Sequence, residues 1–176
     1  MVEPNQIIPD KDYVFRQSVP RERTGTKKRK FPNESHFQLK DGERGLSVNW
    51  KRFITLEENF LLISITYSRK NIFLDHRIFK IFQYPVALFR NIKQIEDVIH
   101  SPEENGDPSP VGKPNNPSHS EVLYKNDIEI FVKLSDYCAE NFEEAYCEFD
   151  VNSINEKAKE LRANLNKTKY HRKDWK

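Results

Sequence analysis

Two histidines flank the longest segment of this chain that carries no periodic pattern. His100 and His119 stand at the two ends of residues 101–118, which hold half of the ten prolines of the whole sequence. Each proline removes a backbone N–H and fixes φ, so the segment is predicted to be a long loop. Imidazole titrates near neutral pH, and two of them at the mouth of a sheet would serve as general base and general acid.

Arg16 or Lys113 would complete such a site by binding a phosphate group. One hypothesis is therefore a small enzyme acting on a phosphate-containing or nucleotide substrate, a nuclease or phosphoesterase, with His100, His119 and Arg16 as catalytic residues. An ADP-ribosyltransferase-like enzyme is a related alternative, because Arg16 and Ser47 fall on predicted strands. A structural interpretation competes with both, in which the histidines and Ser118 only tie down the ends of the loop.

Two basic clusters instead suggest contacts with nucleic acid. Lysine and arginine neutralise phosphates, and aromatic side chains stack on unpaired bases. The candidate residues for binding nucleic acid or a partner are Lys27, Lys28, Arg29, Lys30, Lys169, Arg172, Lys173 and Trp175. The sequence pI of about 8.4 is low for a dedicated nucleic-acid-binding domain, so a solvated basic loop and tail remain an alternative.

The acidic side chains are concentrated elsewhere in the chain. Residues 121–150 hold two Lys or Arg against nine Asp or Glu, although the net charge of the whole chain is only +2. Such segregation favours association with charged partners. An acidic surface over 121–150 would dock a basic protein, and the basic segments would bind an acidic one.

Composition limits the classes of protein that remain. With 36% hydrophobic and 32% charged residues, the chain has no apolar run near the roughly 20 residues of a membrane span, so we expect no membrane contact. The N-terminal residues lack the pattern of a secretory signal. Cys138 and Cys147 have neither metal-binding spacing nor the density of a disulfide scaffold. These features indicate a reduced, cytoplasmic protein with no metal and no cofactor.

Strands and short helices alternate along the sequence. We expect a flexible lead-in at 1–12, a single α+β domain at 13–166 with the long loop 101–118, and a basic tail at 167–176. The sheet should be mixed or antiparallel, with about five strands and three to four helices.

Capping signals place the expected helices. Thr55 and Glu58 form a capping box for a helix that runs to about residue 68, and Asn126 or Asp127 caps a second. The pair Ser153 and Glu156 predicts a third. The β-branched and aromatic runs at 13–19, 46–50, 78–89, 121–124 and 145–149 are predicted strands.

Three segments of the chain resemble a loose group of small bacterial proteins of uncharacterised function. They are residues 16–20, residues 37–48 and Asn116-Pro117-Ser118-His119, the last ahead of a strand and a helix. The resemblance covers roughly residues 13–140 and implies a bacterial or phage-related cytosolic origin, without an established activity. The basic residues 27–30 and the basic tail depart from it.

Together these features favour a non-catalytic accessory or binding module of a cytosolic bacterial protein complex. Its size is typical of accessory subunits in toxin–antitoxin or phage-defence systems. Another protein is the expected partner, and nucleic acid is a second. The small enzyme described above is the alternative hypothesis.

Overall fold

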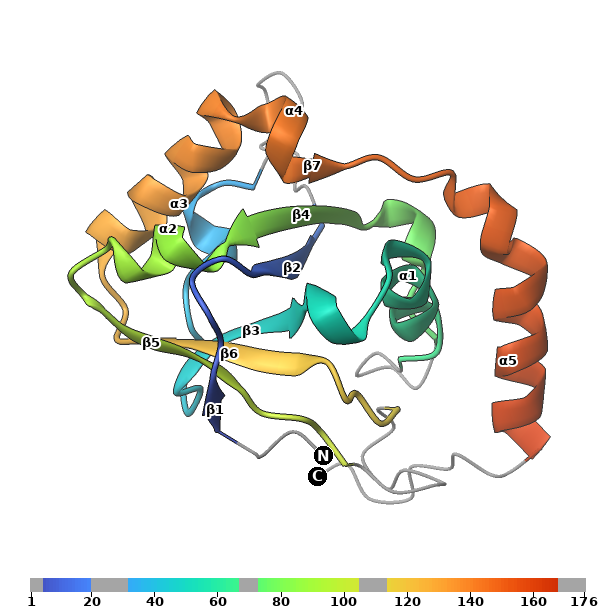
Figure 1. Cartoon of the computed structure of the whole chain (residues 1–176). Coiled ribbons are helices and arrows are strands. Elements are labelled where there is room, and N and C mark those ends of the chain that lie inside the picture. Colours follow the sequence, from blue (N-terminus) through green and yellow to red (C-terminus); the bar gives the residue numbers. More distant parts are fainter. Residues whose placement is uncertain (1–4, 20–31, 67–72, 105–113, 168–176) are drawn as a thin grey trace.

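The computed structural model describes residues 5–19, 32–66, 73–104 and 114–167, which fold around one sheet (Figure 1). Seven strands in these ranges pair antiparallel in the order β1-β5-β6-β3-β2-β4-β7. They are β1 (Gln6–Ile7), β2 (Tyr13–Ser18), β3 (Gly45–Trp50), β4 (Lys80–Pro85), β5 (Ile95–His100), β6 (His119–Tyr124) and β7 (Tyr146–Cys147). The predicted α+β class is confirmed, with two strands more than expected.

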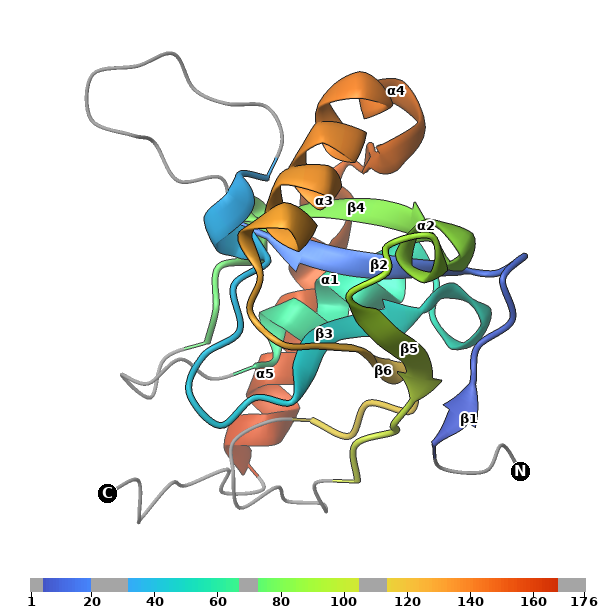
Figure 2. The same ribbon diagram turned by 90° about the vertical axis from the view of Figure 1, so that its left-hand side faces the viewer.

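Helices cover both faces of this sheet. The described residues form α1 (Leu56–Ser64), α2 (Val86–Arg90), α3 (Ile128–Glu140), α4 (Phe142–Ala145) and α5 (Asn155–Lys167). Short 3-10 turns lie at Glu34–His36, Lys51–Phe53, His76–Ile78 and Val151–Ile154. Figures 1 and 2 show α2, α3 and α4 on one face of the sheet and α1 and α5 on the other.

Each face has its own apolar core, because side chains alternate along a strand. On the α3 face, Trp50, Tyr84 and Leu134 belong to the larger cluster of buried side chains. On the α1 face, Phe15 and Phe60 belong to a smaller one. The apolar cover is smaller on the α1 face than on the α3 face.

The capping signals are confirmed at two helices. The Thr55 hydroxyl accepts from the backbone N–H of Glu58, and the Glu58 carboxylate accepts from the backbone N–H of Thr55, so the predicted capping box is present at α1. The helix ends at Ser64, four residues earlier than expected. Asp127 caps α3 by accepting from the backbone N–H of Glu129.

Two predicted strand segments are corrected. Residues 86–89, expected to be strand, belong to α2, in which Val86 and Phe89 lie three residues apart and are both buried. Pro85 fixes φ and precedes the first turn, a position that suits a helix start. Of the predicted strand 145–149, only residues 146 and 147 pair, with Phe82 and Ile81 of β4.

The expected lead-in also contains part of the sheet. Gln6 and Ile7 form β1 and pair with His100 and Ile99 of β5. Within the described ranges, no helix has the length and apolarity needed to span a membrane.

Candidate active site

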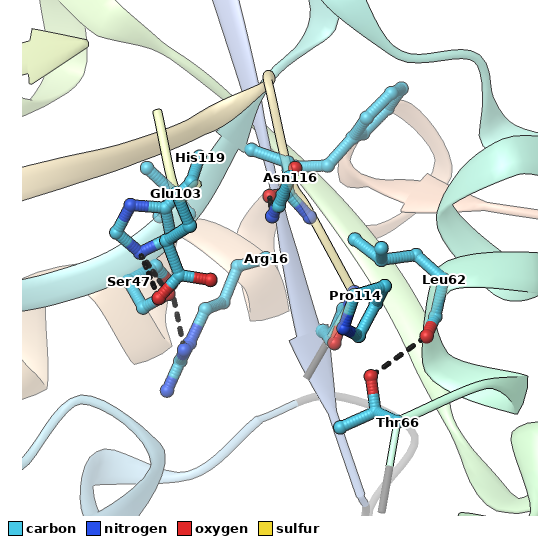
Figure 3. Close-up of a pocket in the computed structure, with 12 residues that line it drawn as sticks. Arg16, Ser47, Leu62, Thr66, Glu103, Pro114, Asn116 and His119 are labelled. Atoms are coloured by element: carbon cyan, nitrogen blue, oxygen red, sulfur yellow. Dashed lines mark hydrogen bonds and ion pairs between the residues drawn. The ribbon is translucent and has the colours of Figure 1, made fainter. Parts of the chain in front are cut away.

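A cavity of about 160 Å³ opens on the α1 face of the sheet, between α1 and the ends of the long loop (Figure 3). Strands β2, β3 and β6 form its floor. The residues around it are Phe15, Arg16, Gln17, Ser47, Val48, Asn49, Leu62, Thr66, Glu103, Pro114, Asn116 and His119. Figure 3 shows Ser47, Glu103 and His119 gathered on one side, with Leu62 of α1 and Thr66, which follows the end of that helix, on the other.

Arg16 lies where two central strands separate. β2 pairs with β3 at only two positions, Val14 with Trp50 and Phe15 with Asn49. Beyond this point the Arg16 guanidinium takes the place of strand pairing. Its Nη1 donates to the backbone carbonyl of Ser47 at 2.7 Å, and its Nη2 donates to that of His36 at 3.2 Å. The guanidinium therefore holds two segments together at the edge of the cavity.

The charge of Arg16 has no carboxylate partner in the part of the chain that the structure describes. Its hydrogen bonds go to two neutral carbonyl groups. Burial lowers the pKa of the guanidinium, while more distant groups that include the Glu43 carboxylate raise it. Arginine remains protonated under all ordinary conditions. A cation at the wall of a cavity, bonded only to neutral groups, favours the binding of an anion.

His119 begins β6 and is held on two sides. Its Nδ1 lies 2.7 Å from the backbone carbonyl oxygen of Ser101 and 3.0 Å from the Ser101 hydroxyl. A carbonyl oxygen only accepts, so Nδ1 carries the proton and donates to it. In the neutral ring Nε2 is then an acceptor. It lies 2.9 Å from Oγ of Ser47, which donates to it.

Sheet register brings these two side chains to the same face. Asn49 of β3 is opposite His119, and Ser47 lies two positions along β3 from Asn49. Residues two apart on a strand point to the same side. Ser47 is exposed to solvent, so its hydroxyl is accessible while it is bonded to the imidazole.

Glu103 adds a carboxylate to the cavity from the long loop. Glu103 and Asn116 form an isolated antiparallel bridge, with backbone N···O distances of 3.0 and 2.9 Å. This bridge fixes the two ends of the loop against each other. One Glu103 carboxylate oxygen lies 4.0 Å from Nε2 of His119.

A hydrogen-bonded network of amide side chains lies beside the cavity. Asn116 Nδ2 donates to Asn49 Oδ1 at 2.8 Å, and Asn49 Nδ2 donates to Asn59 Oδ1 at 3.2 Å. Gln17 Nε2 donates to the same Asn59 oxygen at 2.6 Å. The side-chain carbonyl Oδ1 of Asn116 accepts from both the backbone N–H and the hydroxyl of Ser118. The network joins α1, β2 and β3 to the loop.

The structure places His100 apart from this cavity. His100 pairs with Ser120 on the neighbouring strand, one position from His119, so the two imidazoles project to opposite faces. The His100 ring is 3% exposed and contacts Trp50 and Phe53, with ring centroids 5.3 and 5.1 Å away. Its Nε2 donates to the backbone carbonyl of Pro117 at 2.7 Å. Of the three predicted catalytic residues, the structure brings together Arg16 and His119.

The predicted nucleic-acid-binding residues lie outside the described ranges. They are Lys27, Lys28, Arg29, Lys30, Lys169, Arg172, Lys173 and Trp175. Within the described ranges, no group of three or more His, Cys, Asp or Glu side chains is placed to hold a metal ion.

Sequence reasoning missed Glu103 and the role of Ser47 beside His119. The alternating pattern of residues 46–50 indicated that Ser47 faces away from the buried Leu46 and Val48. The register that brings it to His119 depends on pairing across 72 residues, which no local pattern specifies.

No family model, curated protein or solved structure matches this chain.

Proposed function

We propose that this cavity is the active site of a small enzyme that cleaves or transfers a phosphate ester. The observation that carries the proposal is the 2.9 Å hydrogen bond between the Ser47 hydroxyl and His119 Nε2 in a cavity that Arg16 also lines. A nucleophile bonded to a base, with that base oriented by a third group, is the usual arrangement for covalent catalysis. Here the third group is the Ser101 carbonyl.

Each side chain has a role in the reaction. Ser47 Oγ attacks the phosphorus atom and gives its proton to Nε2 of His119. Water, or a second alcohol, protonates the departing alkoxide as the bond from phosphorus to the ester oxygen breaks, on the side of phosphorus opposite Ser47. The hydroxide or alkoxide so formed then attacks phosphorus from that side, and the departing Ser47 Oγ takes its proton back from His119. Glu103, 4.0 Å from Nε2, stabilises the imidazolium that forms between these steps.

The choice of phosphate over a neutral ester rests on Arg16. Its guanidinium bonds only to carbonyl groups within the described ranges, so its positive charge is available to an anion. Guanidinium groups bind phosphate through paired N–H donors. A cavity of about 160 Å³ has room for a phosphate group.

Covalent labelling tests this proposal directly. A small fluorophosphonate reacts with an activated serine hydroxyl and leaves a phosphonyl group on it, with loss of fluoride. We expect Ser47 to be labelled first, as located by mass spectrometry of peptides. The Ser47→Ala and His119→Gln variants should lose this fast reaction, and a Ser35→Ala control, at an exposed serine outside the cavity, should keep it.

The labelling also separates catalysis from a purely structural role of His119. If the imidazole only ties the loop to the sheet, Ser47 would react no faster than other exposed serines. That result, together with no hydrolysis of nitrophenyl phosphate mono- or diesters, would refute the proposal. Thermal unfolding of each variant shows whether a loss of labelling reflects a loss of folding.

The accessory or binding module in a bacterial complex stays a prediction. The basic residues on which its nucleic-acid contacts depend lie outside the described ranges. The binding-module hypothesis and the enzyme proposal assign roles to different side chains.

A further inference from the structure

A second cavity of about 230 Å³ adjoins the proposed active site along α1. Its apolar lining is formed by Phe53, Ile54, Leu61, Leu62 and Ile65, and the residues 115–118 close its other side. Leu62 and Asn116 line both cavities, so the two spaces are adjacent, with these side chains between them.

Two of these apolar side chains belong to neither core of the protein. Leu62 and Ile65 are partly exposed and, unlike Leu61, are not packed in the buried clusters on either face of the sheet. An amphipathic helix normally turns such side chains inward. Here Leu62 of α1 and Ile65, directly after the end of the helix, line the second cavity instead.

The polar groups at the edge of this cavity are already bonded to other parts of the protein. The carboxylate of Glu58 accepts from Thr55, and the side-chain carbonyl of Asn116 accepts twice from Ser118. The Ser118 hydroxyl is itself a donor in that pair. The lining thus offers apolar contact to a ligand and few polar groups with which to read a base or a sugar.

We propose that the second cavity binds an apolar alcohol group of the substrate, so that the substrate is an alkyl or aryl phosphate ester. The inference rests on the proposed function, because the phosphate must lie at Arg16 and Ser47 for the arm to extend past Leu62. An engineered apolar cavity of about 150 Å³ holds benzene. A cavity of about 230 Å³ is therefore large enough for an aromatic ring or a short alkyl chain.

Calorimetry with a series of ligands tests this assignment. The Ser47→Ala variant removes turnover, and the ligands are inorganic phosphate, methyl phosphate, butyl phosphate and hexyl phosphate. Each methylene that leaves water for an apolar cavity strengthens binding by about fourfold. We expect affinity to rise along the series until the cavity is filled, with phenyl phosphate also bound more tightly than methyl phosphate.

A second variant locates the effect. Of the two cavities, Ile65 lines the apolar one and not the one at Arg16, so Ile65→Asn in the Ser47→Ala background should remove the dependence on chain length and leave the affinity for inorganic phosphate unchanged. Val132→Asn is the matched control, because Val132 is an exposed apolar residue of α3 on the other face. It should leave the whole series unchanged.

The outcomes distinguish the two proposals. Phosphate binding that depends on Arg16, with equal affinity for all chain lengths, overturns the apolar-arm inference and leaves the proposed function standing. Equal affinity for all chain lengths is also expected if a segment of the protein itself occupies the second cavity. No binding of any of these ligands overturns both proposals.

Discussion

Arg16 is a single residue on which both structure and binding depend. Its guanidinium donates to the carbonyls of Ser47 and His36 from two different nitrogen atoms, a geometry that the single ammonium of lysine cannot reproduce. Arg16→Lys should therefore keep the positive charge and lose one of the two contacts.

We expect Arg16→Lys to lower the free energy of unfolding by about 0.5–1.5 kcal/mol, the usual net contribution of one hydrogen bond. The affinity for inorganic phosphate should also fall. Urea unfolding and calorimetry measure the two effects. Wild-type stability in this variant would show that the two carbonyls do not need the guanidinium.

Asn116 joins the loop to the sheet, and its removal affects several partners at once. Asn116→Ala leaves the Asn49 side-chain carbonyl and two donors of Ser118 without their bonds. Because these groups are buried, we expect a loss of about 1–3 kcal/mol in the free energy of unfolding.

Hydrogen exchange at the amide of Ser118 locates this effect. The amide should exchange faster in Asn116→Ala, while the amides of α3 are affected only through the global stability. Replacement of exposed Gln38 by alanine serves as the control and should change neither.

At the scale of elements, the capping box at α1 matters because this helix lines both cavities. Thr55→Ala removes the hydroxyl that accepts from Glu58 N–H and donates to the Glu58 carboxylate. The loss of a threonine cap typically costs about 1 kcal/mol. We expect the unfolding midpoint in urea to fall accordingly with an unchanged dependence on denaturant, and Thr55→Ser to restore most of the loss.

Gly45 allows β3 to approach β6 closely. A Cβ atom at this position would lie 2.8 Å from the backbone carbonyl oxygen of Val122. Because that atom belongs to the backbone of the paired strand, one strand must move. Gly45→Ala should therefore destabilise the protein by about 1–3 kcal/mol. Wild-type stability in this variant, measured by urea unfolding, would contradict the close approach.

Local elements with strong end signals were predictable from the sequence, and pairings across the chain were not. The caps at Thr55 and Asp127 follow from residue types within four positions. The five apolar residues at 85–89 suit either strand or helix, and only packing decides for α2. The meeting of Ser47 with His119 depends on β3 and β6 being neighbours.

On the scale of the whole molecule, acid should reduce stability through carboxylates whose pKa values are lowered by folding. The backbone N–H and hydroxyl of Thr55 lower the pKa of Glu58 from its ordinary 4.5, and Arg77 lowers that of Asp75 from 3.8. At acidic pH the unfolded chain therefore binds more protons than the folded chain. Glu58 and Asp75 contribute their full stabilisation of the folded state at pH values above these ordinary pKa values. This stabilisation is lost as the pH falls through the lowered folded-state values.

Thermal unfolding between pH 6 and pH 3 measures this dependence. The midpoint should fall as the solution becomes more acidic, and Glu58→Gln should make the fall shallower by removing one of the groups. An identical pH profile for the variant and the wild type would show that Glu58 does not contribute.

The two-residue pairing of β2 with β3 has a mechanical consequence for the sheet as a whole. It divides the sheet into a β7–β4–β2 part and a β3–β6–β5–β1 part, and along this line the two strands share two residue pairs and the contact of Arg16 with Ser47. An anion bound by Arg16 of one part and Ser47 of the other would link the two parts of the sheet. Ligand binding would then stiffen the joint between the two halves, and a molecule pulled apart from its two edges would first open there.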